Sequence, residues 1–136
     1  MITLLFSASV LVFFVGLAYT LGLLTGLAIC SPRREDHSRA EEKGIGLLRS
    51  WLTPEQAKQW DSHKRFDVIG SDTGTRYRIK YGAAMNIDEL FDGKVVAQWC
   101  FAPQGNLVVG DVMLAQKIAL ETMELEALRR ANRNRW

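Results

Sequence analysis

A long apolar run opens the chain. Residues 2–30 are mainly Leu, Ile, Val, Phe, Ala and Gly, and no charged residue precedes Arg33. At about 1.5 Å of rise per residue, roughly 20 helical residues cross the hydrocarbon core of a bilayer. A cleavable signal would have a basic start and a shorter apolar stretch. The pattern therefore predicts a permanent transmembrane helix over residues 1–30.

Positive charge lies on only one side of this predicted helix. Arg33 and Arg34 follow it closely, whereas no Lys or Arg precedes it. Lys and Arg collect on the cytoplasmic side of membranes. We therefore expect a single-pass protein of the bacterial inner (cytoplasmic) membrane, with its N-terminus outside and its C-terminal domain in the cytoplasm. Arg33 and Arg34 would be membrane-proximal.

The predicted transmembrane helix has one face of small residues. Ala18, Gly22 and Gly26 recur at four-residue spacing and include a GxxxG motif. Small residues at this spacing let the backbone of another helix approach closely. The face predicts helix packing, with self-association through the GxxxG motif as one option.

The composition changes abruptly after the apolar run. Residues 31–46 mix both charges with Ser, Pro and Gly and show no apolar period, which indicates a juxtamembrane linker. Residues 47–136 suffice for one small domain. A short helix is expected near its start, because Thr53 supplies a capping hydroxyl, Pro54 fits the first helical position and Gln56 completes a capping box.

Alternating polar and apolar residues predict an antiparallel sheet in the middle of the domain. The pair Asp92-Gly93 favours a tight two-residue hairpin. In the second strand, Tyr77, Ile79 and Tyr81 share one face. The predicted strands are residues 66–69, 76–81, 86–90 and 94–101.

A long amphipathic helix is expected to end the domain. Asp111 is a favourable N-cap, and apolar residues recur along one stripe from Val112 to about Arg133. The predicted fold class is therefore α+β. It comprises a single transmembrane helix, then a short helix, about four antiparallel strands and a long C-terminal helix.

Basic side chains gather on one face of the second predicted strand. Arg76, Arg78 and Lys80 alternate with the apolar positions and could bind a nucleic-acid backbone or anionic lipid headgroups. The same row is also typical of a solvated sheet face. Because the net charge is only +2 and the aromatic residues fall on the other face, nucleic acid is a disfavoured partner.

The segment Asp72-Thr73-Gly74-Thr75 resembles the active-site triplet of retroviral-type aspartic proteases. One such triplet per chain would suit a dimer in which two carboxylates share a proton. However, Gly70 and Ser71 stand where a buried apolar strand should precede the triplet. A turn rich in Asp, Thr and Gly explains the same residues, and we predict no catalytic residue here.

No cofactor is expected from the sequence. His37 and His63 are isolated, without Cys or carboxylate residues at metal-ligand spacing. No Gly-rich phosphate loop with its lysine follows a strand into a helix. We therefore predict no metal, no nucleotide and no cofactor-binding residue.

Several distinctive strings occur in the polar part of the chain. They are GSDTGTRYRI (70–79), the strand that begins at Asn86, WCFAPQG (99–105) and GDVMLAQKIALE (110–121). Together they resemble a small domain of uncharacterised alphaproteobacterial and phage proteins, over most of residues 51–132. That family carries no established activity, so the resemblance transfers no functional residue. Its usual members lack an anchor, which suggests a small fold recruited to a membrane assembly.

These observations favour a non-enzymatic function. We expect an accessory or structural subunit of a larger membrane complex, which packs against other membrane protein subunits and the lipid bilayer. The alternative is a membrane-tethered binder of nucleic acid or anionic headgroups through the basic strand face. A dimeric aspartic protease comes third.

Overall fold

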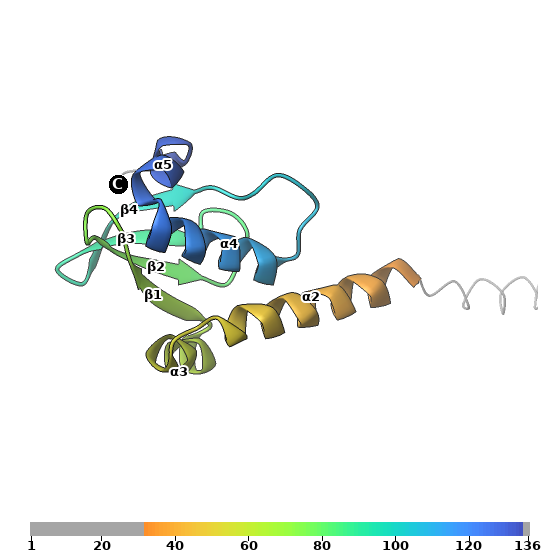
Figure 1. Ribbon diagram of the computed structural model, residues 1–136. Coiled ribbons are helices and arrows are strands. Elements are labelled where there is room, and N and C mark those ends of the chain that lie inside the picture. The colour runs from red at the N-terminus through yellow and green to blue at the C-terminus, as the bar shows by residue number, and fades with distance from the viewer. Residues whose placement is uncertain (1–31, 135–136) are drawn as a thin grey trace, which may run out of the picture. The chain divides into compact units, whose positions relative to one another are not determined.

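The chain forms helices around a five-stranded sheet (Figure 1). The computed structural model describes residues 32–134, with side chains from Asp36 onward. The elements in chain order are α2 (Pro32–Ser50), α3 (Pro54–His63), β1 (Arg65–Ile69), β2 (Arg76–Lys80), β3 (Ile87–Phe91), β4 (Lys94–Cys100), α4 (Val109–Thr122), α5 (Glu124–Arg129) and β5 (Asn132–Asn134).

The sheet is an antiparallel meander with the strand order β1-β2-β3-β4-β5. The predicted hairpin between β3 and β4 is confirmed. Asp92 and Gly93 both have positive φ angles, 48° and 74°, as a tight two-residue turn requires. Glu89 pairs with Ala97 and Leu90 pairs with Val95, so a β-bulge leaves Val96 as the extra residue of β4.

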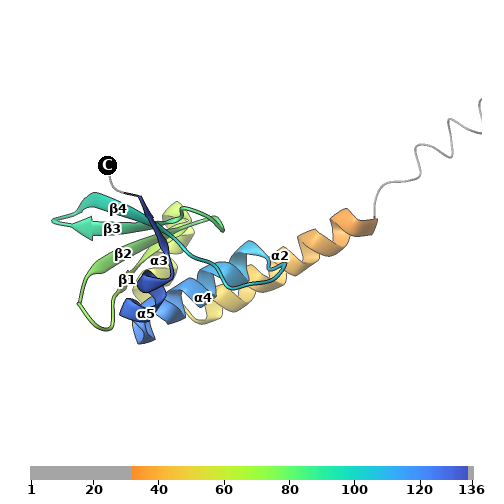
Figure 2. The ribbon, with the colours of Figure 1, turned by 90° about the horizontal axis from the view of Figure 1, so that it is seen from above.

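The core lies between the sheet and α4, which packs against β1 and β2 (Figures 1 and 2). Period-2 alternation points Phe66, Val68, Tyr77 and Ile79 to this side, and all four are buried. Helix α4 contributes Met113, Leu114 and Leu120 to the same cluster. The alternation predicted for the second strand is thereby confirmed for Tyr77 and Ile79, whereas Tyr81 follows the end of β2 and is exposed.

Helix α3 begins at the predicted position. The Thr53 hydroxyl accepts a hydrogen bond from the Gln56 backbone N–H, and the Gln56 side chain accepts one from the Thr53 backbone N–H. This reciprocal pair is the predicted capping box, with Pro54 in the first turn.

Helix α2 replaces the expected linker, because tertiary contacts stabilise a segment that lacks an apolar period. A Cβ atom on Gly110 would lie 2.3 Å from the Gly44 carbonyl carbon, so α2 and α4 cross at two glycines. Leu48 is fully buried in the core. Glu41 accepts a hydrogen bond from the Val109 N–H at 2.9 Å and so caps α4, whose N-cap Val108 has no side-chain cap of its own.

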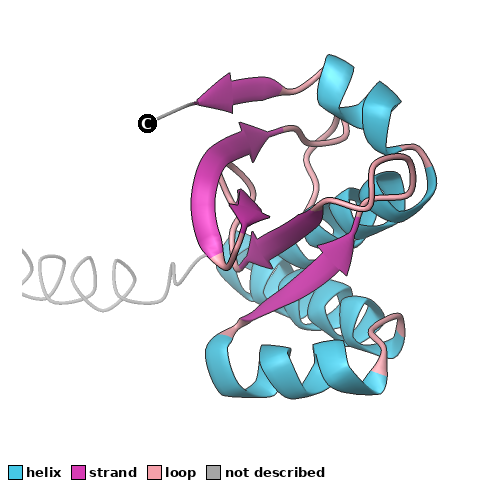
Figure 3. Ribbon diagram, turned by 90° about the vertical axis from the view of Figure 1, so that its left-hand side faces the viewer, coloured by secondary structure: helices cyan, strands magenta, loops and turns pink. Residues whose placement is uncertain are grey.

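The predicted fold class is wrong in the number of strands and in the form of the C-terminal helix. The sheet has five strands instead of about four, and the expected C-terminal helix is two helices that meet at Met123 and are followed by β5 (Figure 3). Helix α4 begins at Val109 with Val108 as its N-cap, instead of being capped by Asp111. No helix within residues 32–134 is long and apolar enough to cross a membrane. The predicted transmembrane helix, residues 1–30, lies outside the described residues.

Candidate functional site

The predicted basic strand face is a mixed charged surface. Arg78 donates two hydrogen bonds to the Asp67 carboxylate, at 2.8 and 3.1 Å, and Asp67 raises the pKa of Arg78. Lys80 pairs with Asp88 at 2.8 Å. Arg76, at the start of β2, is exposed. Two of the three predicted residues are therefore engaged by neighbouring carboxylates, and the face offers no uniform positive row.

The remaining predicted residues belong to the N-terminal part of the chain. Arg33 and Arg34 fall in the first turn of α2. Ala18, Gly22 and Gly26 lie outside the described residues.

The Asp-Thr-Gly segment forms the β1–β2 loop and surrounds a buried carboxylate. Glu124 is fully buried and accepts hydrogen bonds from the backbone N–H groups of Asp72 and Thr73, at 2.9 and 2.7 Å. The Thr73 hydroxyl and the Tyr77 hydroxyl also donate to it. We call Glu124 with these donors the Glu124 cage.

The contacts between this loop and α5 are reciprocal. The Asp72 carboxylate accepts a hydrogen bond from the Leu125 N–H at 2.9 Å, and the Ser71 hydroxyl accepts one from the Glu124 N–H. A Cβ atom on Gly70 would lie 2.3 Å from the Glu124 carboxyl carbon, so only glycine allows this approach. Asp72 thus caps the first turn of α5, whose N-cap Met123 provides no side-chain cap.

The cage keeps Glu124 ionised. Burial alone would raise the pKa of this carboxyl, but the hydrogen bonds from Thr73, Tyr77 and Asp72 outweigh burial and lower it. Burial, reinforced by the neighbouring Glu124 charge, raises the pKa of the Tyr77 hydroxyl, so this group stays a donor.

A second buried polar cluster joins the sheet to α4. The side-chain amides of Asn86 and Gln116 exchange two hydrogen bonds, at 2.8 and 3.0 Å. Asn86 also donates to the carbonyls of Lys80 and Gly82, and Gln116 donates to the carbonyl of Phe101. Within the part of the chain that the structure describes, no buried side-chain nitrogen or oxygen lacks a partner. Both clusters therefore stabilise the fold.

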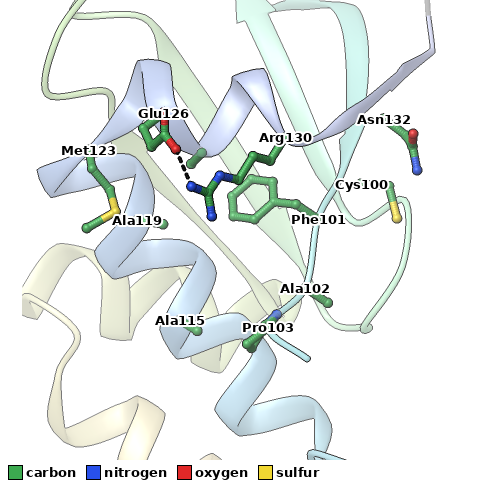
Figure 4. A pocket seen from close by; sticks show the side chains of 11 residues that line it. Cys100, Phe101, Ala102, Pro103, Ala115, Ala119, Met123, Glu126, Arg130 and Asn132 are labelled. Carbon is green, nitrogen blue, oxygen red and sulfur yellow. Dashed lines mark ion pairs between the residues drawn. The ribbon is translucent and has the colours of Figure 1, made fainter. Parts of the chain in front are cut away.

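A cavity of about 680 Å³ lies between α4, α5 and the segment that follows β4 (Figure 4). Its floor consists of the small residues Ala115, Ala119 and Ala127. Met123 lines it beside α4, and Phe101 and Pro103 line it on the side of the segment that follows β4. We call this cavity the alanine groove.

The polar groups of the alanine groove are few. Arg130 pairs with Glu126 at 2.6 Å, so their charges largely cancel at the rim. Cys100, Ala102 and Asn132 complete the lining. Within residues 32–134, no group of three or more His, Cys, Asp or Glu side chains is placed to hold a metal ion. The arrangement is suited to binding apolar side chains.

Comparison with known proteins adds no further constraint. No family model, no curated protein and no solved structure matches the chain. The resemblance to the alphaproteobacterial and phage domain stays a prediction.

The sequence carried a partial signal for the alanine groove. Ala115, Ala119 and Met123 recur every four residues and so share one side of α4. The stripe predicted from the sequence instead comprises Leu114, Ile118, Leu125 and Leu128. Ile118 and Leu125 are exposed, whereas Leu114 and Leu128 pack in the core. Phe101 and Pro103, which follow β4, form the opposite wall of the groove. The helical periodicity of α4 gives no information about which distant residues lie against it.

Proposed function

We propose that the domain formed from Asp36 onward is a non-enzymatic protein-binding module, an accessory subunit of a larger complex. The alanine groove is its recognition site and takes the apolar face of an amphipathic helix from a partner subunit. The observation that carries this proposal is the groove itself, an apolar hollow of about 680 Å³ floored by alanines. Location of the complex at a membrane stays a prediction of the sequence.

The shape of the groove favours a helix as the occupant. Ala115, Ala119 and Met123 follow one another along α4 and its C-cap, so one wall of the groove runs along that helix (Figure 4). Small floor residues admit bulky side chains, as the apolar anchors of an amphipathic helix require. The Glu126–Arg130 pair neutralises the rim, which suits an uncharged face.

The roles of the buried polar groups also support the alanine groove as the recognition site. Asp72 caps α5, and Glu124 is enclosed by four donors. The carboxylates of Asp72 and Glu124 therefore serve the fold, and they are not available to bind a partner.

Site-specific photo-cross-linking tests the proposal. A photoreactive amino acid replaces Ala119 in the full chain, expressed in its native cells, and the matched control places it at exposed Lys58 of α3. The cross-linked protein is identified, purified and shown to bind the unlabelled chain directly. We expect one partner at Ala119, cross-linked through an amphipathic helix, and none of it at Lys58.

Two results would contradict the proposal. The first is equal cross-linking of the partner at both positions. The second is a full chain that runs as a lone monomer on native mass measurement after gentle extraction.

A further inference from the structure

A small hollow lies where α3 meets β1 and β2. It has a volume of about 120 Å³ and is lined by five polar side chains, Gln59, His63, Arg65, Asp67 and Arg78. About 10–15 Å³ of cavity volume suffices for one water molecule, so this hollow has room for a polyatomic ion. We call it the α3–β1 pocket.

The secondary structure directs these side chains to one place. Gln59 and His63 stand one turn apart on the same side of α3. Arg65 and Asp67 alternate onto one face of β1, and Arg78 of β2 lies directly opposite Asp67. The Gln59 side chain accepts a hydrogen bond from the Asp67 N–H at 2.7 Å, which joins the helix to the strand.

The acceptors of the α3–β1 pocket are already engaged. Asp67 is the one carboxylate in the lining, and both of its oxygens accept hydrogen bonds from Arg78, at 2.8 and 3.1 Å. The side-chain oxygen of Gln59 accepts from the Asp67 backbone. A cation in the pocket would therefore compete with hydrogen bonds that the fold already makes.

The donors of the pocket, in contrast, are in excess. Arg78 holds Asp67 through Nε and Nη2, so the N–H groups at the end of its planar guanidinium point away from that carboxylate and are fixed in direction. The hydrogen bond from Asp67 uses only the oxygen of the Gln59 amide, so the amide nitrogen remains a donor. Arg65 and His63, both exposed, bring further N–H groups.

We propose that the α3–β1 pocket binds a phosphate group, carried by a small soluble molecule or by a lipid headgroup. The two guanidiniums of Arg65 and Arg78 outweigh the single negative charge of Asp67, so the pocket is positively charged. Guanidiniums form bidentate, charge-assisted hydrogen bonds with phosphate oxygens. Donors from one helix and two strands surround the hollow, which suits an ion with several oxygens.

Titration of the full chain with inorganic phosphate tests the proposal, with the chain held in mild nonionic detergent and the backbone amides of residues 59–67 followed by NMR. We expect saturable shifts at constant ionic strength, with a Kd of about 1 mM or tighter. Arg65→Gln should weaken binding about tenfold, because a charge-assisted donor is lost. The control Arg76→Gln changes an exposed arginine of β2 outside the pocket and should bind phosphate like the unmodified chain.

A second measurement separates the two sources of the phosphate group. The full chain is placed in nanodiscs of phosphatidylcholine, with and without phosphatidic acid. Shifts that phosphatidic acid produces without added phosphate, and that Arg65→Gln removes, assign the ligand to a headgroup. Shifts that require added phosphate assign it to a soluble molecule.

Three outcomes would overturn the proposal. The first is the absence of saturation by about 20 mM phosphate. The second is that sodium chloride of equal ionic strength produces the same shifts, which means that the pocket does not select phosphate. The third is equal affinity of Arg65→Gln and Arg76→Gln, which means that binding depends on diffuse positive charge. None of these outcomes bears on the alanine groove, so the two proposals fail independently.

Discussion

Glu124 and Glu126 stand two residues apart in α5 but have different surroundings. Glu124 is fully buried and accepts hydrogen bonds from the loop after β1 and from Tyr77. Glu126 lies at the rim of the alanine groove and pairs with Arg129 and Arg130. Both pKa values are lowered, that of Glu124 by the hydrogen bonds of its cage against the effect of burial, and that of Glu126 by Arg129 and Arg130.

Within this short helix, Glu124 therefore stabilises the fold, whereas Glu126 lies at the proposed binding site. On the Glu124 side, every buried side-chain nitrogen and oxygen of the described residues has a partner, so a change there should cost stability. On the groove side, small apolar side chains face open space, so a change should cost little stability and act on a partner. The following predictions test this division.

Loss of the Glu124 carboxylate should have the largest effect. Glu124→Ala leaves the buried Tyr77 hydroxyl without its acceptor and removes the acceptor of the Asp72 and Thr73 N–H groups, and we expect the free energy of unfolding to fall by about 3–5 kcal/mol. Urea unfolding of the full chain, followed by tryptophan fluorescence, measures it. A loss below about 1 kcal/mol would show that the cage does not stabilise the fold.

The crossing of α2 and α4 should be the next most sensitive point. Gly110→Ala places a Cβ atom 2.3 Å from the Gly44 backbone, so the helices must separate. We expect a loss of about 1–3 kcal/mol in the same unfolding assay. Gly46→Ala in α2 is the control, since its Cβ meets nothing within 4 Å, and it should be neutral or stabilising. Equal effects of the two changes would contradict the close crossing.

Acid should weaken the Glu124 side selectively. The folded-state pKa of Glu124 lies below its ordinary value of 4.5, so its stabilisation is complete above that pH and is lost as the pH falls through the lowered pKa. Between pH 6 and pH 3, Glu124→Gln should lose less stability than the unmodified chain. Glu126→Gln should follow the unmodified chain closely, because its exposed ion pairs are screened by solvent. The reverse order would contradict the comparison.

Capping of α5 by Asp72 should contribute a smaller amount. Asp72→Ala removes the acceptor for the Leu125 N–H, and we expect a loss of about 1 kcal/mol. Asp72→Asn keeps a side-chain oxygen and should lose less. If both variants unfold like the original chain, Asp72 does not cap α5.

Local signals accounted for much of the sheet and for α3. The capping box at Thr53 and the Asp92-Gly93 turn depend on residues within a few positions, and both are present. The four predicted strands match β1 to β4 to within a residue or two at each end. The alternation in the second predicted strand identified the buried face of β2 at Tyr77 and Ile79.

Contacts between distant residues decided the rest. The break at Met123 has no Gly or Pro signal, and α5 instead begins where Glu124 meets a loop about 50 residues earlier. Helix α2 forms in a charged segment because Gly44 and Leu48 pack in the core. Strand β5, with the sequence Asn-Arg-Asn, has no apolar pattern. The alanine groove is lined by α4 and α5 on one side and by the segment after β4 on the other. Only the folded structure brings these segments together, so the sequence alone could not locate the groove.

The smallest effect on stability is expected in the alanine groove, and it provides the most direct test of the central claim. The measurement is the affinity of the cross-linked partner for the full chain carrying Ala119→Arg, with Ala84→Arg in the exposed β2–β3 loop as the control. We expect Ala119→Arg to change the unfolding free energy by less than about 0.5 kcal/mol and to weaken binding at least about tenfold, while Ala84→Arg changes neither. Equal affinity of the two variants would contradict the assignment of the groove as the recognition site.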